Sequence, residues 1–330
     1  MTTRKKWTIA IAAVLLVSVA IALLLWRRSV ESGPALLRVL PAGADLYALA
    51  NLESFQANPA VRRFLEDPPG VGVSEDYRRF VEASGFRYQD DLRQLALAKL
   101  GSNYLGAVRI AANRERMLEY LSTARTANPE ESANPAKTEV LGVTVFTFGQ
   151  ERPFRLALPE PDLAVFTIGD DNSLIENMLI RQASSSADGS GASDLASSGD
   201  LPRFTKGDAF ALVLRTERLQ NQELPQTDSG PFRFGGPLLR GSRALYVTVR
   251  SNLTQLDFEV ENRCEDPAAA ERFARMMQSL LVLLRASPID QSEGAEQKLS
   301  VLLRDISVQQ VSDSVLLTWQ WDAGTLRRLE

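Results

Sequence analysis

The chain opens with one long apolar run and then changes to short alternating segments. The run from Trp7 to Trp26 contains no charged residue and no proline. A helix rises about 1.5 Å per residue, so this run reaches about 30 Å, the thickness of a bilayer's hydrocarbon core. Arg4-Lys5-Lys6 precede it, Arg27-Arg28 follow it, and a tryptophan stands at each end. The pattern predicts a transmembrane helix with basic and aromatic flanks.

A cleaved signal peptide is the competing interpretation of this run. Signal peptides carry a shorter apolar region of about 7–15 residues and end in a small-residue cleavage site. The run is longer than that and no such site follows it, so an uncleaved anchor is favoured. Basic residues are more numerous on its N-terminal side. This bias predicts a single-pass protein of the cytoplasmic membrane, with the N-terminus inside and the body in the periplasm or outside the cell.

Strand and helix patterns alternate through the first part of the body. Residues 45–52 form a nearly continuous apolar run, which is typical of a strand covered on both faces. The apolar runs at 92–100 and 104–111 are joined by Gly101-Ser102-Asn103, a hairpin signal. Further strands are expected at 138–141, 143–148, 154–158 and 163–168, and helices are expected after Asn58-Pro59, Ser74, Asn113 and Ser173.

The opening pattern returns in the second part of the body. When Asp45 is aligned with Asp208, Tyr47 falls on Phe210. The segment 254–264 then alternates cleanly between apolar and acidic side chains, which predicts a strand with one packed and one wet face. A helix after Asp266-Pro267 and strands at 306–311 and 314–321 complete the pattern.

The fold expected from these patterns is α+β. It consists of a transmembrane helix followed by two similar modules of mostly antiparallel sheet, each with helices packed on one face. The stretch "ASSSADGSGASDLASSGD" has almost no large apolar residue and predicts a flexible linker between the modules. The boundaries are 1–28 for the tail and anchor, 29–39 for a tether, 40–182 for the first module, 183–202 for the linker and 203–330 for the second module.

Composition excludes several classes of chemistry. The chain has no histidine, one cysteine and a formal net charge of −4. Without histidine there is no Ser-His-Asp or Cys-His nucleophile, and most zinc sites are excluded. Cys264 has no partner for an internal disulfide, and its pattern predicts a small buried core residue. The body without its basic N-terminal segment is more acidic still, which argues against nucleic acid as a partner.

Motif searches give no catalytic, cofactor-binding or metal-binding residue. The chain lacks a P-loop, a nucleophile elbow and an S-x-x-K motif. Asp188 and Asp194 lie in a Gly/Ser run but do not fit a calcium loop. The adjacent pairs Asp90-Asp91 and Asp170-Asp171 stand where helix caps are expected, and neighbouring side chains point apart. Trp319 and Trp321 share a face with apolar neighbours and are expected in the core.

One long loop is the best candidate for contact with a partner. The stretch 220–243 is rich in glycine and proline and also carries large apolar residues, and long loops of this kind are often functional. These residues are Phe232, Phe234, Leu238 and Leu239. The alternative is a loop that folds back on its own core.

Three segments carry a resemblance to a known group of proteins. After the anchor the chain reads "LPAGADLYALANLESF", then "GFRYQDDLRQLALAKL" and "LGAVRIAANRERMLEYL". This order resembles uncharacterised bacterial membrane-anchored proteins of unknown function, whose ectodomain opens with an L-P-x-x-x-x-x-Y segment. The resemblance implies no reaction, cofactor or site residue.

The function expected from the sequence is therefore that of a membrane-anchored, extracytoplasmic and non-enzymatic protein, a protein-interaction or envelope-associated module. Two alternatives stay open. One is an anchored hydrolase that acts through paired carboxylates, and the other is a ligand-binding protein with a cleft between its two modules.

Overall fold

The fold was analysed in a computed structural model. It describes residues 35–59, 61–62, 75–123, 135–184, 189–204, 208–217, 241–286, 305–322 and 324–325. The predicted anchor, Trp7 to Trp26, lies outside these residues, as does the predicted contact loop 220–243 except for its last three residues. Within the described ranges, no helix combines the length and the apolarity that a membrane crossing requires.

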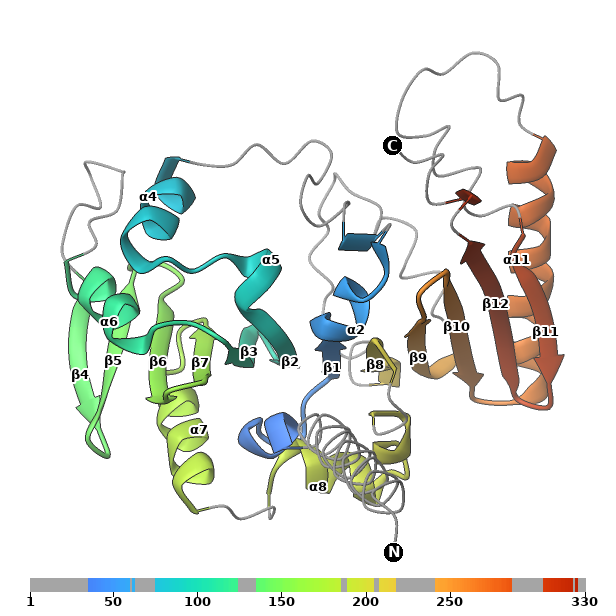
Figure 1. The fold of residues 1–330 in the computed structure, drawn as a ribbon. Helices are drawn as coiled ribbons and strands as arrows, with labels where there is room; N and C mark the ends of the chain where they lie inside the picture. Colours follow the sequence, from blue (N-terminus) through green and yellow to red (C-terminus); the bar gives the residue numbers. More distant parts are fainter. Residues whose placement is uncertain are drawn as a thin grey trace, which may run out of the picture.

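The described strands form one antiparallel sheet. Its order is β11-β12-β10-β9-β8-β1-β2-β3-β7-β6-β5-β4, and Figure 1 shows it running from β4 at the left to β11 at the right. The strands are β1 (Leu46–Asn51), β2 (Leu92–Leu100), β3 (Asn103–Ile110), β4 (Ala136–Val140), β5 (Val143–Phe148), β6 (Phe154–Glu160), β7 (Leu163–Ile168), β8 (Phe210–Arg215), β9 (Ser242–Ser251), β10 (Gln255–Cys264), β11 (Ser307–Val311) and β12 (Ser314–Asp322). The large antiparallel sheet agrees with the predicted α+β class.

Helices cover both faces of this sheet. They are α2 (Leu52–Gln56), α4 (Glu75–Ser84), α5 (Tyr88–Asp91), α6 (Arg114–Thr123), α7 (Ser173–Ser184), α8 (Gly191–Ser197), the 3-10 helix η2 (Leu201–Phe204) and α11 (Pro267–Ala286). On one face α7 and α8 join the largest core cluster, which contains Tyr47 and Ala107. On the other, α4 and α6 pack around Val108. The prediction of helices on a single face was wrong, because alternate residues of these strands are apolar on both sides.

The two halves of the body meet at the centre of the sheet, where β1 pairs with β8. The register places Tyr47 opposite Val213 and Leu49 opposite Ala211. The largest cluster crosses this junction, since it also includes Tyr246 of β9. Phe210, which the sequence alignment matched with Tyr47, instead packs in the cluster around Val249 on the opposite face. The matched residues therefore do not occupy equivalent faces.

Most of the predicted linker is structured. The helix α7 runs to Ser184, and α8 and η2 form within residues 189–204. Ser190 is buried and caps α8 by accepting a hydrogen bond from the Ser193 N–H at 3.2 Å. Leu195 is fully buried against the central cluster. The prediction of a flexible linker was wrong for this stretch, because a local cap and a few small apolar side chains suffice to dock a short helix.

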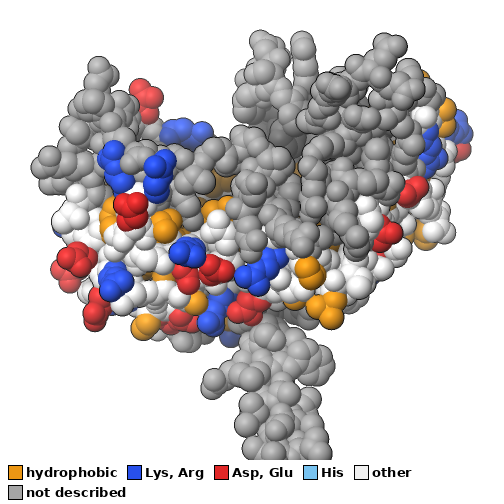
Figure 2. Space-filling model, turned by 45° about the horizontal axis from the view of Figure 1, so that its top comes forward, with side chains coloured by type: hydrophobic (Ala, Val, Ile, Leu, Met, Phe, Trp, Pro, Cys, Tyr) orange, Lys and Arg blue, Asp and Glu red, His pale blue; other side chains and the backbone are white. Residues whose placement is uncertain are grey.

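The last residues of the predicted tether are also structured. Residues 35–39 are helical, and Leu36, Leu37 and Leu40 are buried in the central cluster. The body therefore begins before residue 40. On the face shown in Figure 2, the described acidic and basic side chains are interspersed.

Candidate functional site

Two hollows meet at the start of the edge strand β11. Their volumes are about 610 and 660 Å³, and Asp305 and Ser307 line both. Both lie at the end of the sheet where β12 is the only described neighbour of β11. We call this region, formed by β11 and the two hollows beside it, the β11 edge.

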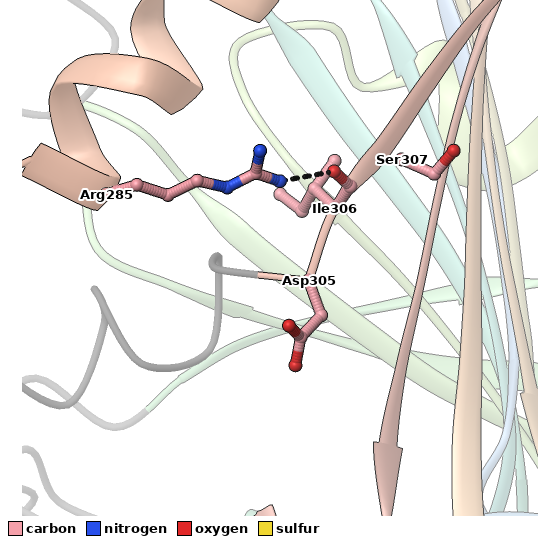
Figure 3. Close-up of a pocket in the computed structure, with 4 residues that line it drawn as sticks. All are labelled: Arg285, Asp305, Ile306 and Ser307. Atoms are coloured by element: carbon pink, nitrogen blue, oxygen red, sulfur yellow. Dashed lines mark hydrogen bonds between the residues drawn. The ribbon is translucent and has the colours of Figure 1, made fainter.

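The first hollow lies between the end of α11 and the start of β11. It is lined by Arg285, Asp305, Ile306 and Ser307, as Figure 3 shows. The Arg285 guanidinium donates a hydrogen bond to the Ile306 carbonyl at 3.0 Å. At the other end of α11, the Gln310 side-chain amide donates to the Pro267 carbonyl at 3.2 Å. These two bonds fix α11 along the edge strand.

The second hollow lies over β10, β12 and β11 and is predominantly acidic. Among the described residues that line it, four carry carboxylates and one, Arg250, carries a guanidinium. Arg250 is 3.1 Å from Asp208 and 3.5 Å from Glu259, so its charge is already balanced within the protein. The acidic residues of the lining are Asp257, Glu259, Asp305 and Asp322. The negative potential of this hollow favours a basic side chain.

On the side away from β12, the backbone of β11 has no strand partner among the described residues. Ser312 and Asp313 form a two-residue turn, with a positive φ of 56° at Ser312. In such a hairpin the two residues that flank the turn, here Val311 and Ser314, exchange backbone hydrogen bonds. Every second residue pair along the two strands is hydrogen-bonded in the same way. The N–H and C=O groups of Val308 and Gln310 consequently point away from β12.

The strand β11 carries none of the side chains that usually protect an edge strand from pairing. The strand reads Ser-Val-Gln-Gln-Val, with no charged residue and no proline. Val308 packs against the α11 cluster, whereas Ser307, Gln309 and Val311 are exposed. Proteins usually protect open edges with lysine, proline or a bulge. An edge of this kind can accept an additional strand.

A second polar cluster lies partly buried at the junction of the two halves. Asp194 of α8 accepts three hydrogen bonds, from the Gly43 N–H (2.8 Å), the Tyr47 hydroxyl (2.8 Å) and the Arg215 guanidinium (2.7 Å). The Tyr47 hydroxyl is also 2.8 Å from the Pro41 carbonyl. Pro41 and Tyr47 belong to the L-P-x-x-x-x-x-Y segment. The contact between them closes the loop formed by this segment, and the contact of Tyr47 with Asp194 joins the loop to α8.

Burial and charge shift the pKa values in this cluster. Burial raises the pKa of Tyr47, and the hydrogen bond to Asp194 adds to the effect. Burial also pushes the pKa of Asp194 upwards, but the donors Arg215, Gly43 and Tyr47 outweigh it and leave that pKa below its ordinary value. Tyr47 is fully buried, so the cluster serves to hold the junction together.

The adjacent acidic pairs Asp90-Asp91 and Asp170-Asp171 lie at element boundaries, as expected. Asp91, the last residue of α5, accepts a hydrogen bond at 2.7 Å from the N–H of Arg87, the residue before the helix. Asp171 accepts from the Ser173 N–H at 2.9 Å, at the start of α7. Neither pair lines the β11 edge. Among the residues that the structure describes, no group of three or more Cys, Asp and Glu side chains is placed to hold a metal ion.

The cysteine and the aromatic pair lie where the sequence predicts. Cys264 is buried in the α11 cluster, and burial raises the pKa of its thiol. The Trp319 ring stacks on Phe258 with centroids 4.9 Å apart, and Trp321 contacts the same phenyl ring at 4.2 Å. Both tryptophans are partly buried against core clusters.

Sequence reasoning missed the β11 edge and the Asp194 cluster. The strand β11 was predicted, but its edge position follows from the pairing of β12 with β10, which no local pattern encodes. The short uncharged pattern of β11 was the only available signal. Asp194 was set in a linker, so its contact with Arg215 could not be anticipated.

Comparison with known proteins gives only distant structural likeness. No family model matches the chain, and no curated protein matches it. Crystal form III of a protein named TP0453 is similar at 11% identity, with a TM-score of 0.47, over 89% of this chain and 96% of that one. Crystal forms I and IV of TP0453 each give 12% identity and a TM-score of 0.43, over 89% of this chain and 95% of that one. At these values the likeness supports no statement about function.

Proposed function

We propose that this is a non-enzymatic, single-pass membrane-anchored protein. Its body, two related α+β modules outside the cytoplasmic membrane, binds an extended segment of another protein along β11. The observation that carries the proposal is the uncharged strand β11, which has no second neighbour among the described strands, with an acidic hollow beside it. The anchor from Trp7 to Trp26 supports the location.

The geometry of the edge defines what the bound segment must look like. An added strand would pair with the outward N–H and C=O groups of Val308 and Gln310, which is the basis of β-strand addition. Its side chains would point alternately to the two faces of the sheet. On the face of the second hollow, a lysine or arginine would meet the carboxylates of Asp305 and Asp257. The partner is therefore an extended, basic segment.

The carboxylate-dependent hydrolase remains the alternative, and it would use the same acidic hollow. Three of the carboxylates there already have partners, and one of them is Asp322, which accepts a hydrogen bond from the Thr325 N–H at 2.6 Å. Asp257 accepts a hydrogen bond from Gln255 at 2.7 Å, and Glu259 is 3.5 Å from Arg250. These contacts favour a binding role, because a catalytic pair needs one free nucleophile or base and one proton donor.

Site-specific photo-crosslinking in native membranes tests the binding role. The full chain would carry a benzophenone amino acid at Gln309, on the exposed face of β11, or at Leu253, an exposed control position on the turn between β9 and β10. We expect a discrete adduct from Gln309 alone. Val308→Pro, which removes an outward N–H, and Asp305→Asn with Asp257→Asn should each weaken it. Equal labelling from both positions, or an adduct insensitive to these substitutions, would refute the proposal.

Protease accessibility tests the location separately. Protease added to intact spheroplasts should digest the body, whereas a cytoplasmic marker should survive. Full protection of the body in intact spheroplasts, with digestion only after lysis, would place it in the cytoplasm and overturn this part of the proposal.

A further inference from the structure

Among the described strands, β4 lies at the opposite end of the sheet and pairs only with β5. Leu141 and Gly142 form a two-residue turn with positive φ at both positions, 54° and 76°. Val140 and Val143 flank this turn and form its hydrogen-bonded pair. Alternation along the ladder then leaves the N–H and C=O groups of Lys137 and Glu139 pointing away from β5.

The side chains of β4 carry opposite charges on one face. Lys137 and Glu139 are separated by one residue, so both project to the same side of the sheet, and both are exposed. The Lys137 ammonium lies over the Phe146 ring, 5.9 Å from its centroid. Among the described residues, neither charge forms an ion pair with another side chain. Thr138 lies between them and is exposed on the opposite face.

We propose that β4 pairs antiparallel with β4 of a second copy of this chain, around a two-fold axis at Thr138. In this register Lys137 stands opposite Glu139 of the partner subunit, and Glu139 stands opposite Lys137 of the partner subunit. Both pairs use the outward backbone groups, so four hydrogen bonds form across the axis. Thr138 faces Thr138 of the partner subunit. Opposite charges and paired threonines are each favourable across strands.

The choice of a second copy rests on the self-complementarity of this edge. The pattern Lys-Thr-Glu reverses its charges when it is read in the opposite direction, which is what a two-fold antiparallel contact requires. The competing interpretation is that the charges protect the edge from pairing, as lysines often do. A strand of five residues, Ala136–Val140, buries little area, so we expect weak association in solution and stronger association when the chain is confined to a membrane.

Disulfide trapping tests the register. The full chain with Thr138→Cys, reconstituted in liposomes, should form a cross-linked dimer under mild oxidation, because facing Cα atoms in such a pair are about 4.5 Å apart. Ala136→Cys is the matched control. It is exposed on the same strand and face, but its two copies would lie roughly 13 Å apart. The unmodified chain, whose Cys264 is buried, serves as the blank.

Charge reversal tests the pairing chemistry in the Thr138→Cys background. Lys137→Glu alone and Glu139→Lys alone each place like charges opposite one another, and each should reduce cross-linking roughly tenfold. The double variant with both reversals should restore it. An equimolar mixture of the two single variants should form the heterodimer in preference to either homodimer.

Several outcomes would overturn the inference. Cross-linking from Thr138→Cys no stronger than from Ala136→Cys would exclude the register, and equal cross-linking by all charge variants would exclude the ion pairs. Unchanged thermal unfolding of the charge variants checks that the fold is intact. The photo-crosslinking at Gln309 probes the other end of the sheet, so failure of one proposal leaves the other standing.

Discussion

At the scale of single residues, Asp194 links the two halves of the body through three hydrogen bonds. It joins the turn at Gly43, the ring of Tyr47 and the guanidinium of Arg215. These residues come from both halves of the chain and meet in a partly buried setting, with 18% of the Asp194 side chain and 13% of the Arg215 side chain exposed. Loss of the carboxylate leaves Arg215 without its counter-charge.

Asp194→Asn should therefore lower the free energy of unfolding by roughly 2–3 kcal/mol. Asp162→Asn is the matched control. Asp162 also lies 2.7 Å from an arginine, Arg109, but 60% of its side chain is exposed and Glu160 contacts the same guanidinium. Its loss should cost less than about 1 kcal/mol. Urea unfolding of the full chain in detergent measures both values, and equal effects would contradict a special role for Asp194.

The contribution of Asp194 should also depend on pH. Because its pKa is lowered in the folded state, its stabilisation is fully present above the pKa of the unfolded chain, about 3.9. The stabilisation is lost as the pH falls through the lower folded value. The difference in unfolding free energy between the native protein and Asp194→Asn should therefore be constant near neutral pH and shrink below about pH 4. A difference that stays constant to pH 2 would contradict the lowered pKa.

At the scale of elements, the strands and long helices could be predicted, and the docking of short segments could not. The hairpin of β2 and β3, the alternating strand β10 and the helix α11 follow from local periodicity and caps. The helix α8 could not be predicted in this way, because its sequence "GASDLAS" has the composition of a linker. Its stability comes from packing against residues distant in sequence. Gly191, for example, contacts Tyr47 so closely that an added Cβ would lie 2.7 Å from the ring.

Leu195→Ala tests whether α8 is an integral part of the core. Leu195 is fully buried against the central cluster, so its truncation should destabilise the protein by roughly 2–4 kcal/mol. Leu253→Ala, at an exposed turn with 71% of the side chain accessible, should change stability by less than about 0.5 kcal/mol. Thermal or urea unfolding distinguishes the two. If Leu195→Ala changes the stability as little as Leu253→Ala does, α8 is not part of the core and the segment is a linker.

At the scale of the whole molecule, the pairing of β1 with β8 makes one sheet of the two halves. The paired residues Leu49 and Ala211 are far apart in sequence, so no local pattern could indicate this junction. A shared core cluster adds to the coupling between the halves, and so does Asp194, which contacts both Tyr47 and Arg215. We therefore expect the body to unfold in one cooperative transition.

Leu158→Ala provides the sharpest test of this coupling. Leu158 is fully buried in β6, in the first half, and its truncation should destabilise the body by roughly 3 kcal/mol. With Trp7 and Trp26 replaced by Phe, the remaining tryptophans, Trp319 and Trp321, report only on β12 in the second half.

If the body unfolds cooperatively, neither half retains its structure once the shared sheet opens. Leu158→Ala should then shift the unfolding midpoint measured by tryptophan fluorescence as far as the midpoint measured by far-UV circular dichroism. Val315→Ala, in the fully buried position on β12, is the matched control and should also shift both signals together. A tryptophan transition that Leu158→Ala leaves unmoved, with an early loss of circular dichroism, would show that the two halves unfold independently despite their common sheet.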